Sequence, residues 1–306
     1  LWQTRGVNSA RVCGSIRPRD KPCYALDHRS KTDSTMTHKD SAGQAPTNEA
    51  PVQGECAEVT RASPEPLRDQ LFAEQLSERG LFSFNEAVAS VFPDMINRSV
   101  PGYKTVVSMT GVLAARHARP NANIYDLGCS WGASLLSVAK EPACQSCQLI
   151  GIDNSEAMLS AARAHVAQFS EGKQITLQVG DIADLQLADA SVVIMNYTLQ
   201  FIPIAQRNTV LRRIREAMSP GDVMILSEKI TLQDTELNRH LVDLHHDFKR
   251  QQGYSDLEIS QKRDALENVL IPETREAHFE RLRQVGFSRC DVWFQCLNFA
   301  SIIAIA

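Results

Sequence analysis

From residue 124 onward, short runs of apolar residues alternate with longer segments in which apolar residues recur at helical spacing. Short aliphatic runs bounded by turn residues predict buried strands, and a period of about 3.6 predicts helices with one apolar face. Strands are predicted at 124–127, 148–152, 175–179, 192–195 and 222–227. Strands that alternate with helices build a parallel sheet with helices on its faces. The pattern therefore predicts an α/β protein.

Helical patterns also precede this predicted sheet. Helices are predicted at 67–80, 84–98 and about 103–117. Pro93 marks a kink or a new helical start inside the second of them. Together these helices would form a cap across the mouth of a site at the end of the sheet.

The segment after the fifth strand is longer than a simple nucleotide-binding sheet needs. An apolar stripe marks one helix there, formed by Leu237, Leu241, Leu244 and Phe248. Ser255 and Glu258 have the spacing of a capping box, which predicts the start of a second helix. A last helix over about 274–285 leads to strands near 289–295 and 298–305, and their tight connection predicts an antiparallel pair. We therefore expect a seven-stranded, mostly parallel sheet whose last strand is antiparallel.

Residues 1–66 differ in composition from the rest of the chain. They are rich in polar residues and proline, with few large apolar residues and no lasting period. Such a segment cannot bury enough apolar surface to offset its ordering entropy, so we predict a disordered tail. Residues 67–306 would then form one α/β domain.

The net charge and the cysteines limit the partners, the cellular compartment and the metal sites that we expect. The formal net charge of -4 argues against a broad nucleic-acid surface, and no apolar run is long enough to span a bilayer. The eight cysteines form no even framework, so we expect reduced thiols in a cytoplasmic protein. Cys144 and Cys147 form a CxxC pair, but a zinc site would need a second pair and a redox pair would need a helix N-terminus. We therefore expect no metal site.

The stretch from Ile124 to Gly132 has the order strand, glycine turn, helix, which is typical of a nucleotide-binding cradle. Gly128 and Gly132 would let the backbone approach a ligand closely. Ser130 stands where an adenosyl-binding turn usually has its middle glycine. A nicotinamide site would need three glycines in this turn, so it fits less well.

Three later strands also end in polar residues. Asp153 and Asn154 follow the second strand, Asp181 follows the third, and Asn196 ends the fourth. Because ligands bind at the carboxyl ends of parallel strands, these side chains are candidates for one site. Asp153 would suit ribose hydroxyls, and Asp181 would accept from an adenine amino group. The alternative is that Asp153 or Ser155 only caps the next helix.

Longer motifs are similar to those of one enzyme family. They are VFPDMINRSVPGY (91–103), YDLGCSWGAS (125–134), IDNSEAM (152–158), NYTLQF (196–201), LSEK (226–229), HHDFKRQQGYSDLEISQKR (245–263) and WFQC-NF (293–299). Through them, residues 68–306 resemble the carboxy-S-adenosylmethionine synthases of the tRNA wobble-uridine pathway. The resemblance implies a Rossmann-like class I methyltransferase fold with a helical N-terminal cap and a helical insertion after the fifth strand.

The resemblance implies carboxyl transfer rather than methyl transfer. Enzymes of this family take S-adenosylmethionine and prephenate and produce carboxy-S-adenosylmethionine and phenylpyruvate. Prephenate would lose its ring carboxyl as CO2 together with its hydroxyl, the released base would deprotonate the sulfonium methyl, and the resulting ylide would attack CO2. Neither a metal nor a general base from the protein would then be required.

The resemblance also assigns residues by motif position. It places cofactor contacts on Tyr103, Gly128, Cys129, Ser130, Asp153, Asn154, Asp181, Ile182 and Asn196. It places Arg263 on the new carboxylate, because a guanidinium can hold a carboxylate bidentately. Charge and placement, rather than the resemblance, make Arg98, His245, His246 and Lys249 candidates for prephenate contacts, with a surface or structural role as the alternative for each. A homodimer is implied, in which Arg263 serves its own site or a neighbour's, and the product would pass to a separate tRNA carboxymethyltransferase.

Two other functions stay open from the sequence alone. An ordinary methyltransferase acting on a small molecule or tRNA would remove the methyl group of S-adenosylmethionine without prephenate. A non-catalytic adenosyl-binding partner of a tRNA-modifying enzyme would bind the nucleoside without turnover. The sequence contains no recognisable RNA-binding module that would support direct tRNA contact.

Met36 opens a polar stretch that is typical of a translation start, whereas residue 1 is Leu1. We expect translation to begin near Met36. Intact-mass spectrometry of the natively expressed protein should then find a chain that starts in this region. A mass that includes Leu1 would contradict the expectation.

Overall fold

The structure is a computed structural model that describes residues 67–75, 82–170 and 175–306. The predictions of a disordered tail over 1–66 and of a start near Met36 concern residues outside these ranges.

The sheet contains the seven predicted strands and a short additional strand, β6. Its strands are β1 (Asn123–Leu127), β2 (Gln148–Asp153), β3 (Ile175–Val179), β4 (Ala190–Asn196), β5 (Val223–Thr231), β6 (Glu273–Thr274), β7 (Arg289–Cys296) and β8 (Phe299–Ile305). They lie in the order β3-β2-β1-β4-β5-β8-β7, and the short β6 pairs with β5 outside this path. Strands β1 to β5 pair in parallel, whereas β8 runs antiparallel to β5 and β7. The predicted mostly parallel sheet with an antiparallel last strand is confirmed.

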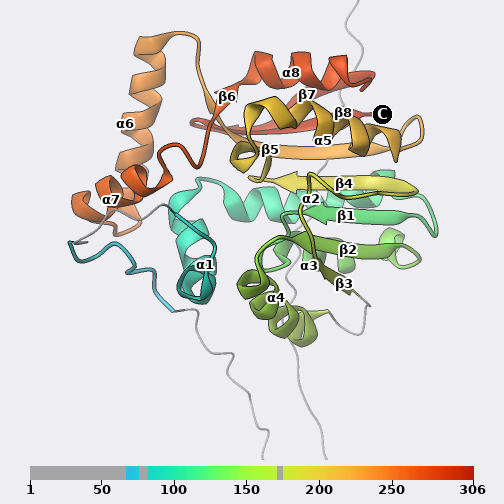
Figure 1. Ribbon diagram of the computed structural model, residues 1–306, viewed down its shortest axis with the longest axis horizontal. Coiled ribbons are helices and arrows are strands. Elements are labelled where there is room, and N and C mark those ends of the chain that lie inside the picture. Colours follow the sequence, from blue (N-terminus) through green and yellow to red (C-terminus); the bar gives the residue numbers. More distant parts are fainter. Residues whose placement is uncertain (1–66, 76–81, 171–174) are drawn as a thin grey trace, which may run out of the picture. The chain divides into compact units, whose positions relative to one another are not determined.

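Helices cover the sheet and the edge where its parallel strands end. They are α1 (Glu86–Ser99), α2 (Tyr103–His117), α3 (Ala133–Ala139), α4 (Glu156–Phe169), α5 (Ile204–Glu216), α6 (Thr235–Gln251), α7 (Asp256–Leu266) and α8 (Arg275–Gln284), with single 3-10 turns η1 (Pro142–Cys144) and η2 (Leu199–Phe201). In Figure 1, α1, α6 and α7 lie on the side toward which the arrowheads of β1 and β4 point. The predicted helical cap and the helical insertion after β5 are thus both present. Helix α1 runs through Pro93 without restarting.

The central strands β1, β4 and β5 are buried on both faces, because their apolar side chains point alternately to opposite sides of the sheet. In β1, Ile124 packs in one hydrophobic cluster and Tyr125 in another. In β4, Val192 and Val193 divide in the same way. Helices α5 and α8 complete the cluster that contains Tyr125, and α2 and α3 complete the cluster that contains Ile124. Because the central strands are mostly apolar runs, their side chains contribute to a hydrophobic core on each side of the sheet.

Polar side chains fix where the helices begin. The hydroxyl of Ser155 accepts a hydrogen bond from the main-chain N–H of Met158 at 3.1 Å and caps α4. Ser255 and Glu258 form the predicted capping box at the start of α7. Such caps satisfy N–H groups that have no partner within the first turn of a helix.

The helix predicted over 67–80 is wrong where the structure describes it, because 67–75 form turns and irregular chain. The rest of that range lies outside the described residues. Asp69 shows the physical reason. Its main-chain N–H donates to the Asp94 carboxylate at 2.7 Å, and its own carboxylate accepts from the Tyr254 hydroxyl at 2.5 Å. Contacts to distant parts of the chain therefore hold this segment outside a helix.

The apolar stripe predicted on α6 exists, but it is not the buried side of the helix. Leu237 and Leu244 are 56% and 37% exposed. The side chains of His245 and Lys249, by contrast, are buried. Helix α6 therefore turns part of its polar face toward the rest of the domain.

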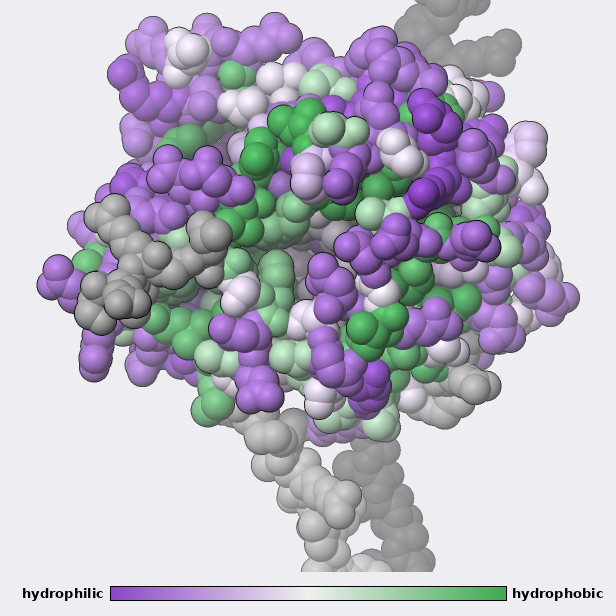
Figure 2. All heavy atoms as spheres, viewed as in Figure 1, coloured by the Kyte–Doolittle hydropathy of each residue, from purple (hydrophilic) through white to green (hydrophobic). Residues whose placement is uncertain are grey.

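Further sites could lie on the surface, at the CxxC pair or at groups of metal-binding residues. The face in Figure 2 is mostly hydrophilic at its rim, with hydrophobic residues gathered nearer its centre. Cys144 and Cys147 are packed in the hydrophobic cluster that contains Ile124. Within the described residues, no group of His, Cys, Asp and Glu is arranged to hold a metal ion. In the same part of the chain, no helix is long and apolar enough to cross a membrane.

Candidate functional site

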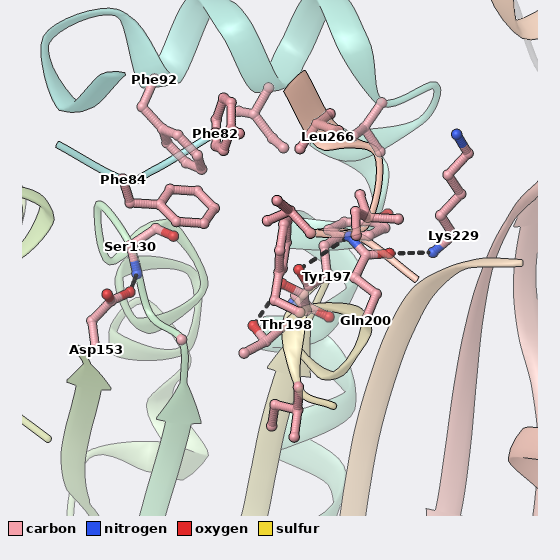
Figure 3. Close-up of a pocket in the computed structure, with 18 of the residues that line it drawn as sticks. Phe82, Phe84, Phe92, Ser130, Asp153, Tyr197, Thr198, Gln200, Lys229 and Leu266 are labelled. Carbon is pink, nitrogen blue, oxygen red and sulfur yellow. Dashed lines mark hydrogen bonds between the residues drawn. The ribbon is translucent and has the colours of Figure 1, made fainter. Parts of the chain in front are cut away.

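The candidate site is a pocket at the edge of the sheet where the parallel strands end. Its volume is about 410 Å³, within the usual range of small-ligand sites. Residues from β1, β2, β4, β5 and β8 and from α1, α2, α6 and α7 line it. Figure 3 shows Asp153 at one side of the pocket and Lys229 at the other, with Tyr197 between them. The cap and the insertion thus enclose the strand ends.

The turn after β1 has a backbone shape that few residues allow. Gly128 has a φ of 76°, and a Cβ there would meet the hydroxyl of Thr198 at 2.3 Å. Ser130 has a φ of 48°, in the left-handed region that favours glycine. The serine found in place of the usual glycine therefore keeps the turn's conformation, at a cost on the order of 1 kcal/mol.

Asp153 ties this turn to the start of the next helix. One carboxylate oxygen accepts from the main-chain N–H of Ser130 at 2.9 Å, and the other accepts from that of Ser155 at 2.9 Å. Burial raises the pKa of Asp153, and these hydrogen bonds oppose the effect. Because the hydroxyl of Ser155 makes the capping bond of α4, the proposed capping role falls to Ser155, and Asp153 faces the pocket.

Asn196, at the end of β4, is held in one orientation. Its amide nitrogen donates to the Ser134 hydroxyl at 3.1 Å, and its oxygen accepts from the Ser227 hydroxyl at 2.7 Å. The side chain therefore presents a fixed polar edge to the cavity. Asn154 and Asp181 are more exposed and lie at the rim.

Most of the predicted cofactor contacts come together in this pocket. Its lining includes Tyr103, Gly128, Cys129, Ser130, Asp153, Asn154, Asp181, Ile182 and Asn196. Arg263 is not part of that lining. Its side chain is 63% exposed and pairs with Asp264 at 3.1 Å. Within one chain, then, Arg263 lies outside the pocket that the predicted cofactor contacts line.

Aromatic side chains that the sequence analysis did not single out cover the pocket. The rings of Phe82 and Phe84 meet edge to face at 5.2 Å, and those of Phe84 and Phe201 at 5.3 Å. Phe92 adds a third edge-on contact to Phe84 at 6.4 Å. In Figure 3, Phe84 lies over Ser130. These rings give the cradle an apolar cover that would exclude water from a bound ligand.

Basic side chains line the opposite end of the pocket. They are Lys229, His245, Lys249 and Lys262. Burial lowers the pKa of Lys249 to about 7 and that of Lys262 to about 8. Sequence reasoning had included His245 and Lys249 but missed the other two. Lys229 could have been predicted from the sequence, because it lies near the carboxyl end of β5. The predicted contacts Asp153 and Asn196 lie at the carboxyl ends of their strands in the same way.

The other two candidates for prephenate contacts do not line the pocket. Arg98 is buried and structural, since it donates to the Gln252 carbonyl at 2.8 Å and to the Asp94 carboxylate at 3.0 Å. His246 lies beside His245 but outside the lining. Of the four candidates, the structure brings His245 and Lys249 to the cavity.

Glu228 positions the loop between β4 and α5. Its carboxylate accepts from the main-chain N–H groups of Leu199 and Gln200, both at 2.9 Å. Burial raises the pKa of Glu228 to about 8, while the charge of Arg207 and the two hydrogen bonds lower it. This contact fixes η2, from which Gln200 and Phe201 reach the pocket.

Comparisons with known proteins agree with this geometry. A family model described as a methyltransferase domain matches residues 124–221. The carboxy-S-adenosyl-L-methionine synthase of Aliivibrio fischeri is 48% identical over 237 residues, which are 78% of this chain and 98% of that protein. The protein of the same name from Pseudoalteromonas translucida is 49% identical over 239 residues, 78% of this chain and 99% of that protein.

Solved structures show a shared fold at low sequence identity. An O-methyltransferase family protein from Burkholderia thailandensis aligns with a TM-score of 0.52 at 16% identity, over 72% of this chain and 60% of that one. At this identity the likeness concerns the fold alone.

Replacing Asp153 by alanine should weaken binding of S-adenosylhomocysteine by on the order of 10- to 100-fold, because a charged hydrogen-bond acceptor and the link between two turns are lost. Isothermal titration calorimetry measures this affinity. Asp291→Ala, at an exposed position of β7, is the matched control. Unchanged affinity in Asp153→Ala would show that the carboxylate has no part in nucleoside binding.

Proposed function

The chain belongs to the family of carboxy-S-adenosyl-L-methionine synthases, and we propose that it converts S-adenosyl-L-methionine and prephenate into carboxy-S-adenosyl-L-methionine and phenylpyruvate. The observation that carries this proposal is that one pocket joins a nucleoside cradle to an end lined by lysines. Prephenate carries two carboxylates, so it needs positive charge in the site, whereas a neutral methyl acceptor does not.

The residues of the cradle fit S-adenosyl-L-methionine. Asp153 would hold the ribose hydroxyls, and Asp181 would accept from the adenine amino group. Ile182 and the phenylalanine cover would pack against the adenine ring. The fixed amide of Asn196 would orient the part of the ligand nearest β4. The fit is supported by a cavity whose volume, about 410 Å³, suits small ligands.

The proposed reaction balances without a further reagent. Prephenate loses CO2 and hydroxide as its ring becomes aromatic, which yields phenylpyruvate. The sulfonium methyl loses one proton, which forms water with that hydroxide, and the methyl carbon forms a bond to the carbon of CO2. The task left to the protein is to hold the two substrates side by side and keep bulk water away. The apolar cover formed by Phe82, Phe84 and Phe201 supports that role.

Arg263 and the oligomeric state belong to the same proposal. We expect Arg263 to reach the carboxylate of the product in the site of a neighbouring chain, because its side chain lies outside its own pocket. Support for a homodimer comes from apolar side chains on the insertion, where Leu237, Leu244 and Leu257 are exposed. Their burial against a second copy would remove apolar surface from water.

The main test is mass spectrometry of the nucleosides formed from S-adenosyl-L-methionine with and without prephenate. A prephenate-dependent gain of one CO2 on the nucleoside, with phenylpyruvate alongside, is expected. Added tRNA should stay unmodified, since a separate tRNA carboxymethyltransferase would use the product on wobble uridine. An unmodified nucleoside in both reactions would contradict the proposal, and methyl loss with a methyl acceptor would favour a methyltransferase instead.

The role of Arg263 is tested by product binding and sedimentation together. Arg263→Ala should lose on the order of 100-fold in affinity for carboxy-S-adenosyl-L-methionine, because a carboxylate loses its bidentate partner, and should remain dimeric. A Leu237→Lys/Leu244→Lys variant should sediment as a monomer and show the same loss. Arg116→Ala, on the exposed side of α2, is the control. Full product affinity in Arg263→Ala would remove Arg263 from the site.

A further inference from the structure

The lysine end of the pocket carries more positive charge than the described chain neutralises. Lys229 comes from β5, Lys249 from α6 and Lys262 from α7. Lys262 has partners, because its amino group lies 3.4 Å from the carboxylate of Asp69 and 3.0 Å from the Ser99 hydroxyl. Among the residues that the structure describes, no carboxylate forms an ion pair with Lys229 or Lys249.

His245 adds no charge at this end of the pocket. It lies one helical turn before Lys249, and its ring donates through Nε2 to the main-chain carbonyl of Ser99 at 2.8 Å. Burial and the charge of Lys249 lower the pKa of His245 to about 3, so the ring is neutral. Lys229 and Lys249 thus remain the cations that line the cavity without a counterion among the described residues.

We propose that Lys229 and Lys249 form a subsite that binds a carboxylate of the acidic co-substrate, across the pocket from Asp153. Naming prephenate as that co-substrate rests on the proposed function, whereas the subsite itself requires only a dicarboxylate that fits the cavity. The subsite is distinct from Arg263, which lies outside this pocket and is assigned to the product's carboxylate.

Burial explains why these two lysines are suited to bind an anion. A buried cation without a partner loses hydration that the protein does not replace, and the loss is recovered when a carboxylate arrives. Lys249 is 8% exposed. The charged and titratable groups that act on it are Lys229, Lys262, Asp69, His245 and His246. Asp69 is the one acid among these groups, and its carboxylate already forms an ion pair with Lys262.

Binding to this subsite should be linked to proton uptake. In the absence of ligand, burial and the charges of Lys262 and Lys229 lower the pKa of Lys249 to about 7. A bound carboxylate favours the charged amine and raises that pKa. Above pH 7 the amine must therefore gain a proton when the ligand binds, so affinity falls as the pH rises, by up to about tenfold per pH unit.

The test is calorimetric titration of prephenate into the full chain saturated with S-adenosylhomocysteine, which has no methyl group to transfer. Lys249→Met and Lys229→Met should each weaken prephenate binding by roughly 30-fold, since each removes one of the two cations that hold the carboxylate. Their affinity for S-adenosylhomocysteine should not change, which also shows that they fold. Lys140→Met, at the exposed end of α3, should behave as the unmodified chain.

The pH dependence separates this role from a merely structural one. Between pH 7 and 9 the unmodified chain should lose prephenate affinity, whereas Lys249→Arg should show a flatter profile because a guanidinium stays charged. Titrations in two buffers of different ionisation enthalpy would measure the proton uptake directly. Prephenate affinity that is equal in Lys249→Met, Lys229→Met and the unmodified chain would overturn the proposal.

A second probe distinguishes failure of the subsite from failure of the proposed function. Succinate is titrated under the same conditions as a simple dicarboxylate. If prephenate does not bind but succinate binds in a manner that depends on Lys229 and Lys249, the subsite stands and prephenate is the wrong co-substrate. If neither acid binds the unmodified chain, the subsite is overturned.

Discussion

The carboxylate of Asp153 makes the contact on which the geometry of the pocket depends. It accepts main-chain hydrogen bonds from Ser130 after β1 and from Ser155 at the start of α4, so two separate turns share one anchor. Parallel pairing makes this possible, because Leu127 and Ile152 are partners at the same edge of the sheet. Buried Glu228 plays the equivalent part on the other side, where it accepts from consecutive N–H groups of η2. Two carboxylates thus fix the loops that carry the site.

Much of the fold could be predicted from sequence because its strands are local apolar runs. The strand at 175–179 and the helix from Tyr103 to His117 have the predicted bounds. The segment 67–75 could not be predicted, because its path is set by contacts between Asp69 and residues far along the chain. The two residues of β6 form a strand only through pairing with β5, which leaves no local signal.

The candidate site was predictable to a similar extent, and for a related reason. Residues at strand ends share an edge by topology, so Asp153 and Asn196 follow from the strand pattern alone. The basic end was harder to predict. Helical periodicity shows which residues of α6 share a face, but it does not show which face packs against the rest of the protein. The apolar residues Leu237 and Leu244 are exposed there, whereas Lys249 is buried against the pocket. Only the three-dimensional arrangement separates this lysine from an ordinary solvated one.

The place of β8 in the sheet has a consequence for how the protein forms during translation. This strand is synthesised after β5 and β7 but lies between them, and its Phe299 completes a wall of the pocket. In a nascent chain, β1 to β5 can already pair in parallel. Strand β7 cannot join the sheet until β8 emerges, because β8 is the strand with which it pairs. The main-chain hydrogen-bonding groups at this edge of β5 stay without a partner strand for the same interval. Pairing of β8 therefore covers the edge of β5 and completes this wall of the pocket in the same step.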